Sequence, residues 1–108
     1  MEKNKIDAYS PTRRLKKHLT SGNLWLYILS LIKREKKLYA YALDSAIKKK
    51  FGFETSKVMI YLVLYRLESE GLIQSKFENR RKYYTLTKKG IEILEIGKKY
   101  LSNLSKVL

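Results

Sequence analysis

The period of the apolar residues changes at Gly71, and this change strongly limits the folds open to the chain. Upstream, "ETSKVMIYLVLYRLESEGL" places four apolar residues on one face of a helix at about 100° per residue: Ile60, Val63, Leu64 and Leu67. Downstream, "LIQSKF" and "KYYTLT" alternate with period two around "ENRR", which predicts a β-hairpin. Because "ENRR" contains no Asn-Gly pair, we expect a longer, mobile tip rather than a two-residue turn.

Three further segments have the apolar spacing of a helix: residues 20–37, 39–53 and 88–107. The four predicted helices have end signals: Ser21 or Asn23, Thr55 or Ser56, and Thr87 as N-caps, and Gly52 as a C-terminal stop. The predicted order is helix, helix, helix, hairpin, helix, in a mainly α fold with a small β-hairpin. That order is the plan of a winged helix-turn-helix domain, whose third helix enters the DNA major groove.

A chain of 108 residues is long enough for one domain with a modest core. We expect three parts: a basic N-terminal arm at 1–20, a winged-helix domain at 21–90 and a C-terminal helix at 91–108. The arm carries six Lys or Arg residues and the only proline, Pro11. Its segment "RRLKKHL" could form a short helix with a narrow apolar face of Leu15 and Leu19.

The charge of the chain points to a polyanionic partner. Lys and Arg number 24 against 10 acidic residues, which gives a net charge of +14. Nucleic acid is the first candidate for that partner and an anionic membrane surface is the second. The N-terminus lacks an apolar signal core, and the longest apolar run, Leu24–Ile32, is too short to span a bilayer. We therefore expect a cytoplasmic protein that does not enter the membrane.

Enzymatic chemistry has little support in the sequence. There is no Cys, no Gly-rich phosphate loop, and a single His, His18, that has no metal-binding neighbours. Glu68 and Glu70 are two residues apart on a predicted helix and so point in different directions. We expect no enzymatic activity, no metal and no cofactor.

The helix end "YLVLYRLESEGLI" (61–73) and the wing segment "RRKYYTLTKKG" (80–90) together resemble the PadR-like winged-helix transcriptional regulators. The segment "YAYAL" (39–43) resembles the Tyr-Gly-Tyr-Glu-Leu of that family, and the resemblance covers about residues 24–90. The chain departs from the family pattern at three positions: Leu62 stands for the usual Pro, Ala40 for Gly and Ala42 for Glu.

The resemblance implies a homodimeric regulator that binds double-stranded DNA sequence-specifically and acts as a repressor. It leaves a small-molecule effector open, since some relatives respond to aromatic compounds. Two other functions remain: a weakly specific chromatin-type DNA-binding protein, and a winged-helix adaptor that binds an acidic protein of the transcription machinery. The high net charge supports the first of these alternatives.

Candidate DNA-contacting residues lie on the wing, the third helix and the start of the second. They are Tyr41, Ser56, Lys57, Met59, Tyr61, Arg80, Arg81, Lys82 and Tyr83. The wing cations would neutralise phosphates, with an ordinary solvated turn as the alternative. Strand alternation places Tyr84 inward with Leu86 and Tyr83 outward. The family resemblance makes Tyr41 and Tyr61 phosphate hydrogen-bond donors, with half-buried structural tyrosines as the alternative.

Two apolar groups have an open assignment. Val58 and Leu62 could contact thymine methyl groups, although core packing is the commoner role of such residues. The last helix carries a stripe that needs a cover, and we expect a two-fold partner to provide it together with Trp25. The stripe consists of Ile93, Ile96, Tyr100, Leu104 and Val107. The alternative is that the last helix packs back on Trp25 and the first core helix of its own chain.

Overall fold

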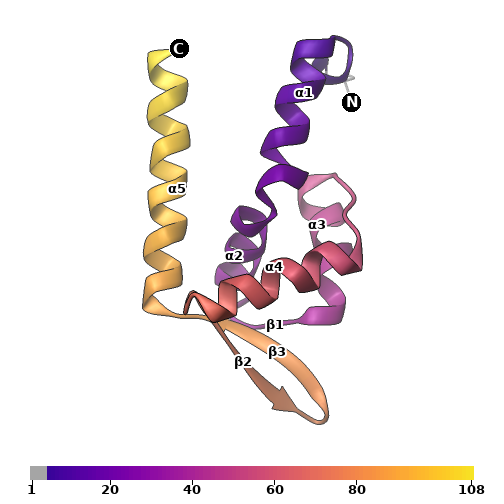
Figure 1. Cartoon of the computed structure of the whole chain (residues 1–108), viewed down its shortest axis with the longest axis vertical. Coiled ribbons are helices and arrows are strands. Elements are labelled where there is room, and N and C mark those ends of the chain that lie inside the picture. Colours follow the sequence, from indigo (N-terminus) through magenta and orange to yellow (C-terminus); the bar gives the residue numbers. More distant parts are fainter. Residues whose placement is uncertain (1–4) are drawn as a thin grey trace.

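A computed structural model describes residues 5–108 as a helical core with a small antiparallel sheet (Figure 1). The α-helices are α1 (Ser10–Leu19), α2 (Leu24–Glu35), α3 (Leu43–Phe51), α4 (Lys57–Ser69) and α5 (Lys88–Val107). The strands are β1 (Leu38–Tyr39), β2 (Ile73–Glu78) and β3 (Arg81–Leu86). Short 3₁₀ turns η1 (Lys5–Asp7), η2 (Ser21–Asn23) and η3 (Ala40–Ala42) precede α1, α2 and α3. The predicted fold class is confirmed.

The core lies between α2, α3, α4 and the inner face of the sheet, and the first turns of α5 close it. Its fully buried side chains include Ile28, Ile32, Leu43, Ile47, Ile60, Leu64, Ile73 and Leu94. The inward face predicted for α4 is therefore confirmed at Ile60 and Leu64. Tyr84 is also buried, with 3% of its surface exposed, as strand alternation predicted.

The predicted end signals act at three helices. The Ser56 hydroxyl accepts a hydrogen bond from the Met59 amide at the start of α4, and the Thr87 hydroxyl does the same for the Gly90 amide at α5. Gly52 ends α3 in the left-handed region at φ 76°. Asn23 precedes α2 but makes no capping bond; its side-chain amide donates to the His18 carbonyl instead. That bond fixes how α1 joins α2.

The sheet contains a strand that the sequence pattern did not predict. β1 pairs antiparallel with β3, with Leu38 opposite Tyr84 and Tyr39 opposite Tyr83, in the strand order β1-β3-β2. The predicted second helix began at Tyr39, whereas α3 begins at Leu43, after the 3₁₀ turn η3. A strand of two residues is too short to show an alternating pattern, so only its pairing with β3 defines it.

The tip of the hairpin, which we call the wing, is a tight turn, and the prediction of a tip longer than two residues is wrong. Glu78 pairs with Arg81 across the hairpin, which leaves Asn79 and Arg80 as a two-residue loop. Both have positive φ, 51° and 66°, as a type I′ turn requires. Asn adopts this region readily, but a left-handed backbone costs a residue such as Arg about 1–2 kcal/mol.

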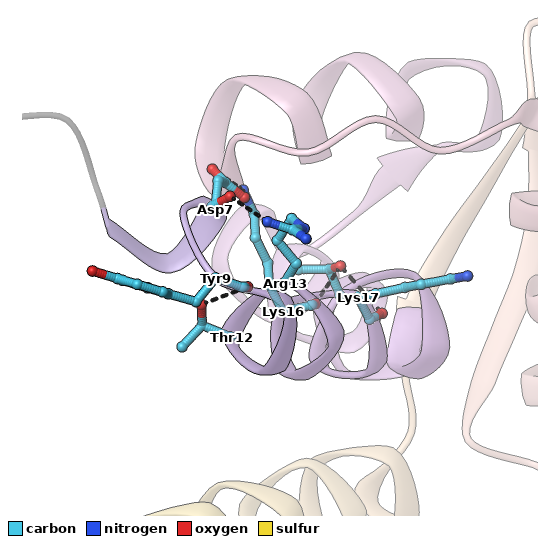
Figure 2. Close-up of polar contacts among 7 residues, drawn as sticks. Asp7, Tyr9, Thr12, Arg13, Lys16 and Lys17 are labelled. Atoms are coloured by element: carbon cyan, nitrogen blue, oxygen red, sulfur yellow. Dashed lines mark hydrogen bonds and ion pairs between the residues drawn. The ribbon is translucent and has the colours of Figure 1, made fainter.

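The described part of the predicted arm is helical; residues 1–4 of that arm lie outside the described residues. Figure 1 shows α1 at the end of the molecule opposite the wing. Figure 2 shows that η1 folds back along α1: Lys16 Nζ lies 3.2 Å from Asp7 Oδ1, and the Arg13 guanidinium donates to the Asp7 carbonyl. The predicted short helix is confirmed, and it begins earlier, at Ser10, with Pro11 in its first turn.

Candidate nucleic-acid interface

Three separate segments meet beside the start of α4, and Tyr41 connects them. Lys57, the first residue of α4, donates from Nζ to the Tyr41 carbonyl at 3.3 Å. The Arg81 guanidinium, at the start of β3, donates to the Tyr41 hydroxyl at 3.4 Å and lies 5.7 Å from the ring centroid. Tyr41 itself belongs to η3, so this one residue connects α4 to the hairpin next to its tip.

A row of tyrosines extends this surface along the sheet. The Tyr39 ring lies 5.8 Å from that of Tyr41 and 6.1 Å from that of Tyr83, and Lys37 Nζ lies 4.9 Å from the Tyr83 ring. Cations over aromatic faces are held by the negative face of the ring. Sequence reasoning missed Tyr39 and Lys37, because their positions depend on the unpredicted strand β1.

Glu78 is the acid nearest the wing cations in sequence, but its carboxylate interacts with Lys37 and Tyr39 instead. Its carboxylate accepts hydrogen bonds from the Tyr39 hydroxyl at 2.8 Å and from Lys37 Nζ at 3.2 Å. These bonds, that of Tyr39 first, lower the pKa of Glu78. Within residues 5–108 none of Arg80, Arg81 and Lys82 makes a salt bridge, so these cations keep their positive charge unneutralised.

The three wing cations, which are adjacent in sequence, are placed in different directions. Arg81 shares a strand face with Tyr83 and meets Tyr41. Lys82 lies on the opposite face, where its Nζ is 5.5 Å from the Tyr84 ring. Arg80 occupies the tip itself. The wing therefore presents charge at its end and on both faces rather than as one cluster.

The outer face of α4 is exposed and apolar. Five side chains form it, and we call it the α4 outer face: Val58, Met59, Tyr61, Leu62 and Tyr65. Val58 is 76% exposed and Leu62 45%, so the core role that we considered commoner for them is wrong. Tyr65, 73% exposed, was absent from the candidate residues. The first half of α4 is apolar nearly all round, so its period could not separate the core face from this one.

One acidic residue of this surface, Asp44, forms an ion pair with one of its cations, Lys57. Asp44 Oδ2 lies 3.0 Å from Lys57 Nζ, and this hydrogen bond is the main cause that lowers the pKa of the Asp44 carboxyl. Lys57 is 60% exposed at its side chain, so it can still face a phosphate. A phosphate that approaches Lys57 must nevertheless compete with Asp44 for the ammonium group.

We expect Asp44→Asn to strengthen DNA binding, by about two- to fivefold, because an exposed ion pair holds its cation by only about 0.2–1 kcal/mol. Asn keeps the side-chain oxygen that accepts from the Ser45 amide, so α3 should remain folded. The control is Glu95→Gln, which also frees lysines, Lys33 and Lys98, but on α2 and α5. Equal gains in the two variants, measured by fluorescence anisotropy, would show a general charge effect instead.

The family model described as "Transcriptional regulator PadR-like family" matches residues 28–96. The chain belongs to the PadR-like family of transcriptional regulators. The match includes α3, α4, the whole sheet and the first half of α5. This PadR-like regulator is therefore a DNA-binding transcription regulator, and the resemblance in residues 61–73 and 80–90 is confirmed.

Solved structures agree with this family and with the winged-helix fold. A PadR family transcription regulator from Clostridium difficile R20291 is 32% identical, with a TM-score of 0.70 over 77% of this chain and 91% of that one. The PadR family regulator of Eggerthella lenta DSM 2243 is 28% identical, with a TM-score of 0.73 over 88% and 87% of the two chains. F93 from STIV, a winged-helix DNA-binding protein, is 20% identical, with a TM-score of 0.70 over 79% of this chain and 92% of that one. At this identity, the likeness supports the fold alone. No curated protein matches the chain.

None of the helices in the described part of the chain has the length and apolar character needed to cross a membrane. No group of three or more His, Asp or Glu side chains in residues 5–108 is placed to hold a metal ion.

Proposed function

We propose that this PadR-like regulator binds double-stranded DNA sequence-specifically as a cytoplasmic homodimer and represses transcription. The recognition helix α4 would enter the major groove, while the wing reaches the backbone and the minor groove. The observation that carries the proposal is the continuous surface from the α4 outer face, through Tyr41, to wing cations that make no salt bridge within residues 5–108. Phosphates would supply the missing negative charge.

The candidate residues take different roles on this surface. Lys57, Tyr41 and Tyr83 would contact phosphates, and Met59 and Tyr61 are exposed enough to enter the groove. Ser56 uses its hydroxyl to cap α4, so its contribution to DNA binding would be to hold the helix N-terminus, where amides attract phosphate.

Arg80 is proposed as the minor-groove residue of the wing. It is exposed at the tip and adopts φ 66°, a position at which glycine would fit without strain. Strain of this kind is commonly retained where the side chain has a function. An Arg side chain carried on a rigid two-residue turn suits the narrow minor groove of A·T-rich DNA, whose negative potential is enhanced.

The dimer is proposed from α5. Its buried face covers the core through Leu94, but the next face, which carries Ile96, Tyr100 and Val107, is 56%, 67% and 80% exposed. Gly97 lets α5 approach α2 so closely that a Cβ there would lie 2.9 Å from Trp25 Cη2. Part of α5 therefore packs on Trp25, and Ile93 packs against the core of its own chain, whereas Ile96, Tyr100 and Val107 are uncovered.

A groove beside the stripe gives the partner a place to dock. It has a volume of about 270 Å³ between the end of α1, α2 and α5. Leu19, Trp25, Leu26, Tyr100 and Leu101 contribute apolar side chains to it. An isologous two-fold contact would cover both groove and stripe with the same surface of a second copy. We accordingly propose residues 91–108 as the dimerisation element, next to the arm at 1–20 and the winged-helix domain at 21–90.

Selection of bound duplexes from a random pool tests the proposed function. A specific regulator should bind its selected duplex about 10³-fold or more tighter than random DNA of the same length. Equal affinity for both would favour the weakly specific chromatin-type function, with which the net charge of +14 is also consistent. Transcription from a template that carries the selected site at its promoter should fall when the protein is added; an increase would refute the repressor role.

A further inference from the structure

The α4 outer face has few groups that can read bases by hydrogen bonding. The side chains that commonly hydrogen-bond to base edges are those of Asn, Gln, Arg, Lys, Asp and Glu. Of these, residues 57–65 contain only Lys57. Lys57, the one cation of this stretch, is already bonded to Asp44 and to the Tyr41 carbonyl. Apart from the hydroxyls of Tyr61 and Tyr65, the face offers only apolar surface.

Apolar surface in the major groove has one specific partner, the C5 methyl group of thymine, since the other base edges there present hydrogen-bonding groups. Val58 and Leu62 lie four residues apart and so are neighbours on the same side of α4. Both are exposed in the described chain, and covering them with thymine methyl groups would remove apolar area from water.

The charges around the face favour DNA over an apolar protein surface as its occupant. Lys57 stands at one end of the face and the exposed Arg66 follows its other end, with Arg81 beside Tyr41. Between positions 57 and 67 the sequence has no acidic residue, and Asp44, which pairs with Lys57, is the acid that borders the face at that end. Phosphates border the major groove on both sides, so a duplex matches an apolar strip with cationic edges.

We propose that α4 recognises its half-site through thymine methyl groups, with Val58 and Leu62 as the specificity-determining residues. The preferred duplex would then be A·T-rich, with thymines in the major groove beneath Val58 and Leu62. This inference rests on the proposed function, because it presumes that α4 enters the major groove of a selected site.

The test replaces each thymine of the selected duplex by deoxyuridine, which removes the C5 methyl group and keeps the base pair. We expect roughly a fourfold loss of affinity for each methyl group in contact, from the burial of one carbon-sized apolar group. Deoxyuridine outside the half-sites serves as the control and should change nothing. Unchanged affinity at every half-site position would overturn the inference while leaving the proposed function intact.

Variants of α4 assign the effect to its side chains. Val58→Ala and Leu62→Ala should each weaken binding to the thymine duplex. Each should also abolish the loss of affinity that deoxyuridine causes at one position of the duplex, the coupling that a double-mutant cycle measures. Both side chains are exposed, so thermal unfolding should stay unchanged. Tyr65→Phe removes only a hydroxyl and so tests the alternative that a hydroxyl of the α4 outer face reads the bases. The inference would be overturned if the deoxyuridine penalty persisted in both Ala variants, or if Tyr65→Phe lost the sequence preference. If selection yielded no preferred site at all, the proposed function would be refuted as well.

Discussion

Raising the salt concentration from 50 to 200 mM is expected to weaken DNA binding by about 10³ to 10⁵-fold, if the dimer contacts six to ten phosphates. Each phosphate that a cation neutralises releases condensed counterions, and added salt opposes that release. Lys57, Arg80, Arg81 and Lys82 are the nearest candidates on each protomer, and two protomers double that number. A dissociation constant that does not depend on salt would contradict the proposed phosphate contacts.

Arg80→Gly combined with Arg81→Ala tests how much of this salt dependence of DNA binding comes from the wing. The log–log salt slope should fall by up to about 3.6, since two cations are removed from each of two protomers at about 0.9 per contact. Glycine suits the left-handed backbone at position 80, so the turn should form at least as well as before. Lys98→Ala with Lys99→Ala removes the same charge from α5 and serves as the control. Lost sequence preference at an unchanged slope would mean that the wing reads bases instead.

The sequence predicted those parts of the fold that depend on local signals. The helical period of residues 60–67, the caps Ser56 and Thr87 and the stop at Gly52 each depend on nearby residues alone, and each is present in the structure. The alternation through Tyr83 and Tyr84 likewise identified the buried ring, because a strand with one covered face must alternate.

The parts that were missed depend on contacts between distant segments. β1 exists through its pairing with β3, and Tyr41 gains its central place only when η3, α4 and the wing come together. The turn at Asn79 and Arg80 is set by the register of the two strands rather than by a favourable dipeptide. The exposure of Val58 and Leu62 could not be read from α4 either, since which apolar face is covered depends on the neighbouring elements.

Tyr100→Glu combined with Leu104→Glu is expected to convert the proposed dimer into a folded monomer. These side chains lie on the uncovered stripe of α5, so two charges there would face each other across a two-fold contact without disturbing the core. Ser102→Glu adds a charge on the opposite side of the helix and should leave the dimer intact. Point substitutions are preferable to ending the chain near Gly90, because that truncation would also remove the buried Leu94.

The loss of the dimer should lower affinity for a duplex with two half-sites by about 10² to 10⁴-fold, because the second contact gains from the high effective concentration that the first creates. Affinity for a single half-site should stay unchanged, since α4 and the wing are untouched by the two substitutions. Sedimentation gives the mass of each variant, and anisotropy with duplexes of one or two half-sites gives the affinities. If the double variant still sediments as a dimer, the partner docks elsewhere than on the α5 stripe. If it sediments as a monomer but binds the longer duplex as tightly as before, one protomer suffices for recognition.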